Sequence, residues 1–325
     1  MSGATRTLQN RRLQNDAARI VAEMSGLTVR LAQAIPRGVM TFKYLVETAD
    51  GERFVVRFYP SSRQAVLNCE PDLLARCRRA GLPVPLVITD ARTGPTASLA
   101  YIVYRMTEGT ALSEALLGFT MAQRRALAAD VTRCLFDLRR IEFHGYGELL
   151  TGDAAAHPSW RAFVNRSFDA GMASLARNRL VDASSLYRLR RLVERVRRIE
   201  DWRPRQLVWG DIRFENILVS TSGRLAGLID FESCLSGDPL ATLGYCFAAH
   251  GTDPWCGLLL GAWPETLDAA SRERILFYAI LRALRLAPYA HRRLPTGQPR
   301  DPLPQIFPGL MLALDTLTNV HGERT

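Results

Sequence analysis

An aspartate and an asparagine stand five residues apart in a short polar loop, and another aspartate follows in the next segment. Asp211 and Asn216 are flanked by apolar runs, and Asp230 closes the apolar run that comes next. Transfer of a phosphoryl group to a hydroxyl needs such a set, because one carboxylate must accept the hydroxyl proton while oxygen ligands hold magnesium against the phosphates. Asp211 suits the first role, and Asn216 with Asp230 suits the second. Singly, these residues also cap turns or end strands, but the spaced triplet favours phosphoryl transfer.

The same segment resembles the signature of the aminoglycoside phosphotransferase and choline kinase-like family. That signature is His-Gly-Asp, then Asn, then a triplet such as Ile-Asp-Phe, and the turn Gly237-Asp238-Pro239 matches the one that the family places next. The resemblance covers most of the chain. It implies an α+β, protein-kinase-like fold with two lobes, an antiparallel sheet lobe followed by a larger and mostly helical lobe. ATP would be held between the lobes with Mg²⁺, and GTP is a possible substitute.

Carried to the N-terminal lobe, the resemblance implies the nucleotide site. Gly38 to Thr41 lies where the family places the loop that covers the phosphates, although this loop is poor in glycine. Arg57 stands at a third-strand position that holds lysine in protein kinases, and its implied partner is Glu70 on the next helix. Arginine keeps the positive charge and can bind phosphate bidentately, so Arg57 would reach the α- and β-phosphates.

Two further assignments in this lobe leave alternatives open. Lys43 is either a rival phosphate ligand or a solvent-facing strand residue, because strand side chains alternate between faces. Backbone groups near Tyr104 and Met106 would meet adenine according to the resemblance. Their side chains are equally the core residues that an apolar strand usually supplies.

The chain departs from the family pattern at three positions. Trp209 stands where histidine is usual, and since indole can donate but not accept a hydrogen bond, we expect it to pack beneath the loop as a structural replacement. Arg139 replaces a common histidine, which we interpret as a packing change. Thr242 replaces a frequent aspartate, which predicts a weaker hydrogen bond in the loop. Because Asp211 is retained, a pseudokinase is the less favoured interpretation.

Hydrophobic periodicity separates a β-rich part from a helical part. A hairpin with an Asp50-Gly51 turn is predicted over 42–58, then a helix over 65–80 closed by Gly81, and a strand over 100–105. Helical spacing prevails afterwards, apart from a β-rich segment near Asp211. We therefore expect a nucleotide-binding lobe over 1–106 and a catalytic and acceptor-binding lobe over 107–325. The helices expected in the second lobe cover 121–140, 160–175, 186–199 and the segment from 272 onward.

The net charge of +10 comes from arginine almost alone, because Lys43 is the only lysine. Arginines are densest over 187–198, where apolar residues recur at helical spacing, which predicts an amphipathic helix with a solvated basic face. No recognised nucleic-acid motif accompanies them, so nucleic acid is an unlikely partner. The charge argues mildly against a strongly polycationic acceptor.

The remaining composition is that of a cytoplasmic globular protein, either a monomer or a homodimer. The first sixteen residues carry no apolar run that resembles a secretory signal. No apolar stretch approaches the roughly 20 residues of a membrane span. The six cysteines form no CxxC pair and are interpreted as reduced, mostly buried thiols.

The leading hypothesis is an ATP-dependent phosphotransferase that modifies a hydroxyl of a small molecule. An antibiotic, aminoglycoside-like or another natural product, is the favoured acceptor, which would serve resistance or biosynthesis. A kinase for choline, homoserine or a sugar is the alternative enzyme, because one scaffold hosts many acceptors. Five residues after the loop would supply aromatic walls and carboxylates for a cationic substrate, or are ordinary loop and helix residues: His250, Asp253, Trp255, Trp263 and Glu265.

Overall fold

The computed structural model describes residues 3–36, 40–91, 99–178, 181–196, 203–251, 253–287, 312–313 and 315–316. The chain divides into two compact units. Unit 1 comprises Met1–Glu108, Leu150–Gly152 and Arg293–Pro299, and unit 2 comprises Gly109–Leu149, Asp153–Arg292 and Arg300–Thr325. Gly38 lies outside the described residues.

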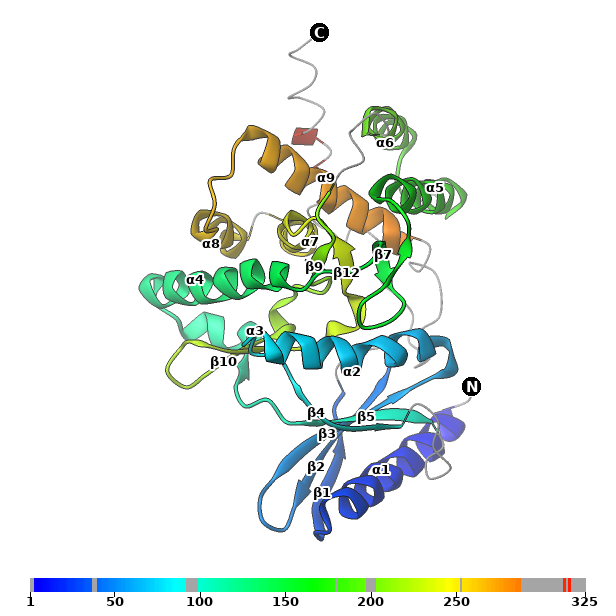
Figure 1. Ribbon diagram of the computed structural model, residues 1–325, viewed down its shortest axis with the longest axis vertical. Helices are drawn as coiled ribbons and strands as arrows, with labels where there is room; N and C mark the ends of the chain where they lie inside the picture. Colours follow the sequence, from blue (N-terminus) through cyan, green and yellow to red (C-terminus); the bar gives the residue numbers. More distant parts are fainter. Residues whose placement is uncertain are drawn as a thin grey trace. The chain divides into compact units, whose positions relative to one another are not determined.

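Unit 1 is built on a five-stranded antiparallel sheet (Figure 1). The strand order is β1-β2-β3-β5-β4, with β1 at Val29–Ala34, β2 at Phe42–Thr48, β3 at Arg53–Tyr59, β4 at Leu86–Ala91 and β5 at Ala100–Arg105. The predicted hairpin joins β2 to β3, and its Gly51 has a φ of 88°, a conformation that glycine adopts without steric cost. The hairpin and β5 confirm the strand predictions for this region.

The two faces of this sheet serve different purposes because side chains alternate along each strand. One face packs apolar residues of β2 and β3, including Tyr44, Val46 and Val56, against the helix α1 (Gly3–Ser25). The other face carries Arg57 and Tyr59, which bond to Glu70 on the helix α2 (Gln64–Arg79). Helix α2 was predicted over 65–80, and Gly81 follows it with a φ of 79°.

Unit 2 contains two small sheets and most of the helices. The first sheet has the order β11-β10-β6 and the second has the order β8-β7-β12-β9. The strands are β6 (Thr110–Ala111), β7 (Tyr146–Leu149), β8 (Ala155–His157), β9 (Gln206–Val208), β10 (Ile217–Val219), β11 (Leu225–Leu228) and β12 (Leu235–Gly237). The helices are α3 (Leu112–Ala115), α4 (Met121–Asp137), α5 (Trp160–Asn178), α6 (Ala183–Val196), α7 (Leu240–His250), α8 (Pro254–Ala262) and α9 (Ala269–Leu286).

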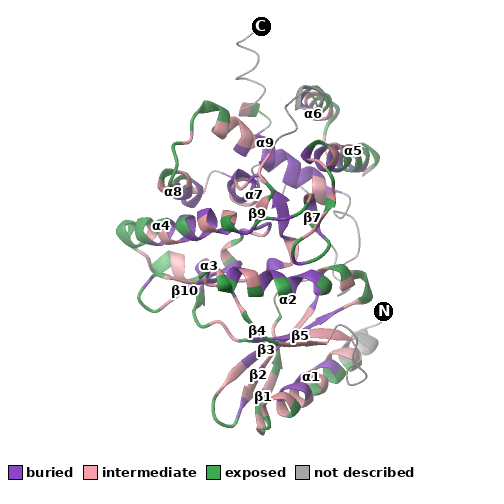
Figure 2. Cartoon of the chain, viewed as in Figure 1, coloured by how far each residue is buried: buried purple, intermediate pink, exposed green. Residues whose placement is uncertain are grey.

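Helices α7 and α9 form the centre of unit 2 and are largely buried (Figure 2). They pack at close range because Gly244 of α7 has no side chain. A Cβ there would lie 2.5 Å from the backbone oxygen of Ile275 on α9. Side chains on the inner face of α9 are therefore held in fixed positions.

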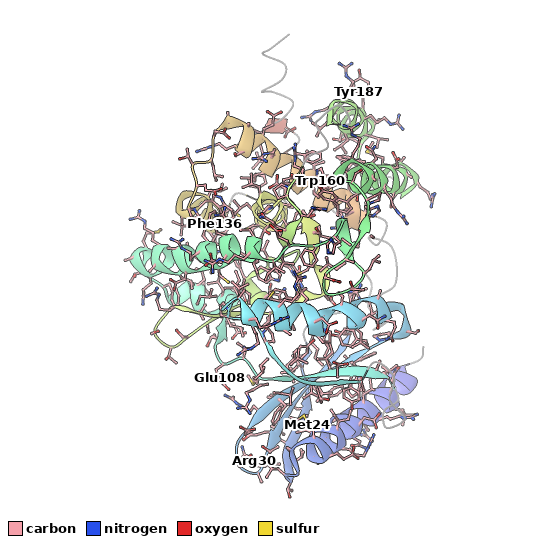
Figure 3. The ribbon with its side chains drawn as sticks, viewed as in Figure 1. Met24, Arg30, Glu108, Phe136, Trp160 and Tyr187 are labelled. Carbon is pink, nitrogen blue, oxygen red and sulfur yellow. The ribbon has the colours of Figure 1, made fainter. Side chains whose placement is uncertain are left out.

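The surface of unit 2 includes the predicted amphipathic helix. Leu189 and Leu192 of α6 are buried, whereas Arg190 and Arg191 are exposed, and Tyr187 projects outward from the helix (Figure 3). All six cysteines are buried thiols, as expected from their spacing. Within the described ranges, no helix combines the length and hydropathy that crossing a membrane requires.

Candidate active site

The loop that carries Asp211 begins immediately after β9 and is tightly packed at its first turn. A Cβ at Gly210 would lie 1.9 Å from the backbone oxygen of Ser233, so only glycine fits there. The loop ends in a short 3₁₀ turn, Phe214–Asn216, that leads directly into β10. Backbone sterics thus fix where Asp211 leaves the strand.

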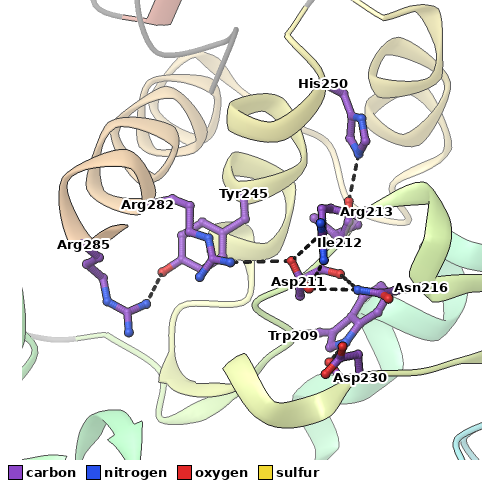
Figure 4. Close-up of polar contacts among 10 residues, drawn as sticks. All are labelled: Trp209, Asp211, Ile212, Arg213, Asn216, Asp230, Tyr245, His250, Arg282 and Arg285. Atoms are coloured by element: carbon purple, nitrogen blue, oxygen red, sulfur yellow. Dashed lines mark hydrogen bonds and ion pairs between the residues drawn. The ribbon is translucent and has the colours of Figure 1, made fainter. Parts of the chain in front are cut away.

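Asn216 is bonded to Asp211 in a way that determines the orientation of its amide. Its Nδ2 donates to the backbone oxygen of Asp211 at 3.0 Å and to Asp211 Oδ2 at 2.9 Å (Figure 4). Both of these atoms are acceptors, so the amide nitrogen must face them. The Oδ1 atom of Asn216 therefore points away from Asp211, where it can serve as an oxygen ligand.

Asp230 is brought next to Asn216 by the pairing of β10 with β11. Ile217 lies opposite Leu228, and Ile229 N donates to Asn216 O at 2.9 Å. Among the described residues, Asp230 is the only non-glycine residue with positive φ, at φ 66° and ψ 71°. Left-handed backbone at such a residue is typical of functional sites.

Trp209 packs beneath this arrangement, as predicted for a structural replacement of histidine. The side chain is fully buried, and its ring stacks on Phe231 with centroids 6.0 Å apart. Its Nε1 donates to the backbone oxygen of Asp230 at 3.4 Å. The indole thus supports the strained Asp230 backbone with the one hydrogen bond that it can make.

Arg213 contacts Asp211 from within the same loop. Its Nε and Nη2 lie 3.1 Å from Asp211 Oδ1 and Oδ2, which is a bidentate pair. Attraction to Asp211 raises the pKa of Arg213. The sequence interpretation overlooked Arg213, although a cation two residues from a candidate catalytic carboxylate was a usable local signal.

Residues of helices α7 and α8 contact the loop that carries Asp211. His250 bonds through Nε2 to the oxygen of Ile212 at 3.1 Å, and its ring stacks on Phe214 at 4.0 Å. The buried Trp255 contacts Phe214 edge-on. Burial lowers the pKa of His250, although the bond to Ile212 opposes this shift, so the ring is held in its neutral form.

The other residues considered for an acceptor wall also have structural roles. Asp253 caps α8 by accepting from Trp255 N at 2.8 Å. Trp263 is buried and packs edge-on against Phe136, and Glu265 pairs with Arg139 at 2.6 Å. The contacts of these three residues are therefore those of ordinary loop and helix residues.

The Gly-Asp-Pro turn is anchored by its own aspartate. Buried Asp238 accepts from Leu240 N at 3.0 Å, from Arg274 at 3.0 Å and from the Tyr278 hydroxyl at 2.7 Å. Thr242 donates its backbone N–H to Pro239 at 3.0 Å. Four hydrogen-bonding groups thus keep the turn in place although Thr242 replaces the frequent aspartate.

In unit 1, the expected pair of Arg57 and Glu70 is present. Arg57 Nη1 lies 3.3 Å from Glu70 Oε1, and Arg57 Nε donates to Thr41 Oγ1 at 2.9 Å. The Tyr59 hydroxyl donates to Glu70 Oε2 at 2.7 Å and lies 3.0 Å from the Tyr104 hydroxyl. Burial raises the pKa of both tyrosines, so both remain neutral donors.

Strand pairing decides where Lys43 and Met106 lie. Lys43 lies directly opposite Arg57 in the β2–β3 ladder, so both side chains leave the same face of the sheet. Met106 N donates to Arg53 O at 2.9 Å. An adenine contact at Met106 would therefore use its carbonyl rather than its N–H.

An antiparallel sheet unit followed by a larger, mostly helical unit is the fold of solved aminoglycoside phosphotransferases, which confirms the predicted fold class. The chain belongs to the phosphotransferase enzyme family, whose sequence model matches residues 32–298. This match confirms the resemblance drawn from the Asp211 segment. No curated protein matches the chain by sequence.

Solved aminoglycoside phosphotransferases share this fold at low sequence identity. A thermostable mutant of APH(4)-Ia in ternary complex with ADP and hygromycin B is 15% identical with a TM-score of 0.67, covering 94% of this chain and 97% of its own. The streptomycin-ATP-APH(2")-IIa ternary complex is 14% identical with a TM-score of 0.61, covering 94% and 95%. ADP-bound APH(2'')-Ib is 16% identical with a TM-score of 0.61, covering 92% and 96%.

Proposed function

We propose that this chain transfers the γ-phosphoryl group of ATP to a hydroxyl of a small molecule, with Asp211 as the base. The acceptor oxygen bonds to the γ-phosphorus while the bond from that phosphorus to the β,γ-bridging oxygen breaks. ADP leaves, and the acceptor proton passes to the Asp211 carboxylate. Catalysis of this kind depends on positioning and charge stabilisation rather than on covalent chemistry by the protein.

The observation that carries this proposal is the bond between Asn216 Nδ2 and Asp211 Oδ2 at 2.9 Å. It holds the proposed base against the proposed metal ligand and turns the amide oxygen away for coordination. The left-handed Asp230 beside it supports the same interpretation. Arg213 would stabilise the negative charge that develops on the transferred group.

The chemistry of the donors fits magnesium. Mg²⁺ prefers oxygen ligands and is usually bound by one or two carboxylates together with substrate phosphates. In the described part of the chain, no three or more His, Cys, Asp or Glu side chains are grouped to hold a metal, so Asn216 and Asp230 would share the ion with the nucleotide. The ion would neutralise charge on the β- and γ-phosphates.

Nucleotide binding would draw on the cluster of unit 1. The proposed contacts are Thr41 and Gly38 for the phosphate loop, Arg57 held by Glu70 for the phosphates, and the carbonyl of Met106, beside Tyr104, for adenine. Lys43 is a second candidate for the phosphates, since it shares a face with Arg57. The APH(4)-Ia and APH(2")-IIa complexes contain ADP and ATP, which supports ATP as the donor, with GTP as a substitute.

The acceptor is proposed to be a hydroxylated antibiotic or related natural product, encountered in the cytoplasm by a monomer or homodimer. Hygromycin B, streptomycin and gentamicin are bound in solved aminoglycoside phosphotransferases that share this fold. A metabolite kinase for choline, homoserine or a sugar is the alternative. Because identity to these neighbours is only 14–16%, they favour the class of reaction over any one acceptor.

The test is acceptor-dependent ADP release with Mg-ATP and with Mg-GTP across aminoglycosides, other antibiotics, nucleosides, choline, homoserine and sugars. Asp211→Asn is assayed alongside. Release by the wild type alone, with a product heavier by one phosphoryl group, is the expected result. Magnesium-dependent nucleotide binding without transfer to any acceptor would instead favour a pseudokinase.

A further inference from the structure

A second cation lies on the side of Asp211 that faces away from the proposed metal ligands. Asn216 and Asp230 lie to one side of Asp211, and Arg282 with Tyr245 lies to the other (Figure 4). Arg282 belongs to α9, the helix that Gly244 brings close to α7. Only 8% of Arg282 is exposed.

The guanidinium of Arg282 is held in position without a hydrogen bond to any described residue. Its Nη2 lies 3.7 Å from Asp211 Oδ1, which is beyond hydrogen-bonding distance. Its guanidinium carbon lies 5.1 Å from the ring centroid of Tyr245, so the ring supports one face of the cation. Among the described residues, Arg282 makes no hydrogen bond, and its N–H donors stay available beside Asp211.

Arg285, one helical turn further along α9, is by contrast an arginine with a hydrogen-bonded carboxylate partner. Its Nη2 donates to Glu148 Oε1 at 2.9 Å, and its Nη1 lies 3.4 Å from the Tyr245 hydroxyl. Glu148 therefore balances the charge of Arg285. Among the described carboxylates, Arg282 has only the longer pairing with Asp211 at 3.7 Å, and both oxygens of Asp211 are already bonded to Arg213.

The charges around Arg282 make a bound anion favourable. Burial lowers the pKa of Arg282, and Arg285 and Arg213 lower it further, against the raising effect of Asp211. A buried cation without full pairing is costly, and an incoming anionic group with oxygen acceptors removes that cost. Arginine matches carboxylate and phosphate groups bidentately.

We propose that Arg282 binds an anionic oxygen group of the acceptor, a carboxylate or a phosphate, while the hydroxyl of the same molecule meets Asp211. This inference rests on the proposed function, because it assumes that Asp211 receives an acceptor hydroxyl. It narrows the acceptor to an anionic hydroxylated compound. A polyamine would bring its ammonium groups against Arg213 and Arg282.

A purely structural role for Arg282 makes a different prediction. If Arg282 only oriented Asp211, its loss would weaken every acceptor equally. If it binds an anion, its loss weakens anionic acceptors alone. Acceptors that share one skeleton and differ in charge therefore separate the two roles.

The test uses four probes on one six-carbon polyol skeleton: gluconate, glucitol phosphate, glucitol and glucamine. Binding of each is measured calorimetrically without nucleotide, for the wild type, Arg282→Gln and the matched control Arg285→Gln. The wild type is expected to bind the two anions about 10- to 100-fold more tightly than glucitol, since a charge-assisted hydrogen bond has that effect. Glucamine should bind most weakly.

Arg282→Gln should abolish the preference for anions and leave glucitol binding unchanged, whereas Arg285→Gln should keep the preference. Comparison of gluconate with glucitol phosphate distinguishes a carboxylate from a phosphate as the group bound. Equal binding of all four probes by the wild type would overturn the inference. So would an anion preference that survives Arg282→Gln.

Transfer from Mg-ATP to the same probes and to the antibiotic panel separates this inference from the proposed function. Anion binding that depends on Arg282, without phosphorylation of any acceptor, would uphold the inference while refuting transfer. Transfer with equal kcat/KM for anionic, neutral and cationic acceptors would uphold the kinase and refute the role of Arg282.

Discussion

Arg57 in unit 1 and Arg282 in unit 2 are both buried arginines beside a tyrosine ring, yet they differ in their hydrogen bonds. Both are buried, with 3% and 8% exposed, and both lie against a tyrosine ring at 5.3 and 5.1 Å. Arg57 is bonded to Thr41 and paired with Glu70. Among the described carboxylates, Arg282 pairs with Asp211 alone, at 3.7 Å, and Asp211 is already bonded to Arg213.

Burial alone therefore does not determine the role of an arginine side chain. Arg57 has a dedicated carboxylate on the neighbouring helix, so its position is maintained by unit 1 itself. Arg282 is positioned by its helix and by Tyr245 but lacks hydrogen bonds to the described residues. A donor group that the fold holds in place without a hydrogen bond to the described residues is available to bind a ligand.

The largest effect is expected for Asp211→Asn, which removes the charge partner of Arg282 and the proposed base together. Asparagine is nearly isosteric with aspartate but cannot accept the proton of the acceptor hydroxyl. Turnover should therefore fall about 10²- to 10⁴-fold, the usual contribution of general-base catalysis. Single-turnover kinetics with Mg-ATP measure the chemical step directly.

Nucleotide binding is the control for this variant. Asp211→Asn should bind Mg-ATP nearly as well as the wild type does, because Asn216 and Asp230 remain. Near-normal turnover by Asp211→Asn would refute the role of Asp211 as the base.

Replacement of either arginine by methionine should change the free energy of unfolding by different amounts. Arg57→Met strands the buried Glu70, so we expect the free energy of unfolding to fall by about 3–5 kcal/mol. Arg282→Met breaks no hydrogen bond to a described residue and removes a poorly paired buried cation, so stability should change by about 1 kcal/mol or less, or rise. Urea denaturation of both variants measures the difference. Equal losses would show that Arg282 is structural after all.

Trp209, like Arg57, is a buried side chain whose polar group is hydrogen-bonded within the fold. Trp209→His restores the usual family residue but leaves a cavity beneath the loop, which should cost about 3 kcal/mol by analogy with other large-to-small core substitutions. Trp209→Phe keeps a ring on Phe231 and loses only the bond to Asp230, which should cost about 1 kcal/mol. Thermal denaturation ranks the two variants. A Trp209→His protein as stable as the wild type would contradict the packing role.

The parts of the fold that local patterns determine were predictable. The hairpin of β2 and β3 has a turn signal between alternating segments, and α2 ends at a glycine. Strand β1 was missed because it is an edge strand with no buried residue, so it lacks alternation between buried and exposed positions. Helix α7 was missed because it is buried nearly all round and shows no apolar stripe.

The candidate site divides in the same way. Asp211, Asn216 and Asp230 share one short segment, so their spacing alone suggested phosphoryl transfer, and their roles stay predictions. Arg282 reaches Asp211 from a helix far along the chain, and only the packing of α7 on α9 brings the two together. The spacing of residues along the sequence therefore could not predict the contact between Arg282 and Asp211.

His250 gives the smallest expected effect and tests whether the loop is supported by a neutral ring. Because burial lowers its pKa from 6.5, the unfolded chain binds a proton near and below that pH while the folded chain does not. Stability should therefore fall as the pH drops below 6.5, by at most about 1.4 kcal/mol per pH unit for one proton, and level off once the folded ring is protonated. His250→Gln should be less stable at neutral pH but should lose this pH dependence, so subtracting its urea-unfolding profile from that of the wild type isolates the ring. A difference profile that is flat between neutral pH and pH 5 would mean that the imidazole keeps its ordinary pKa in the folded protein, and that burial does not hold the ring neutral.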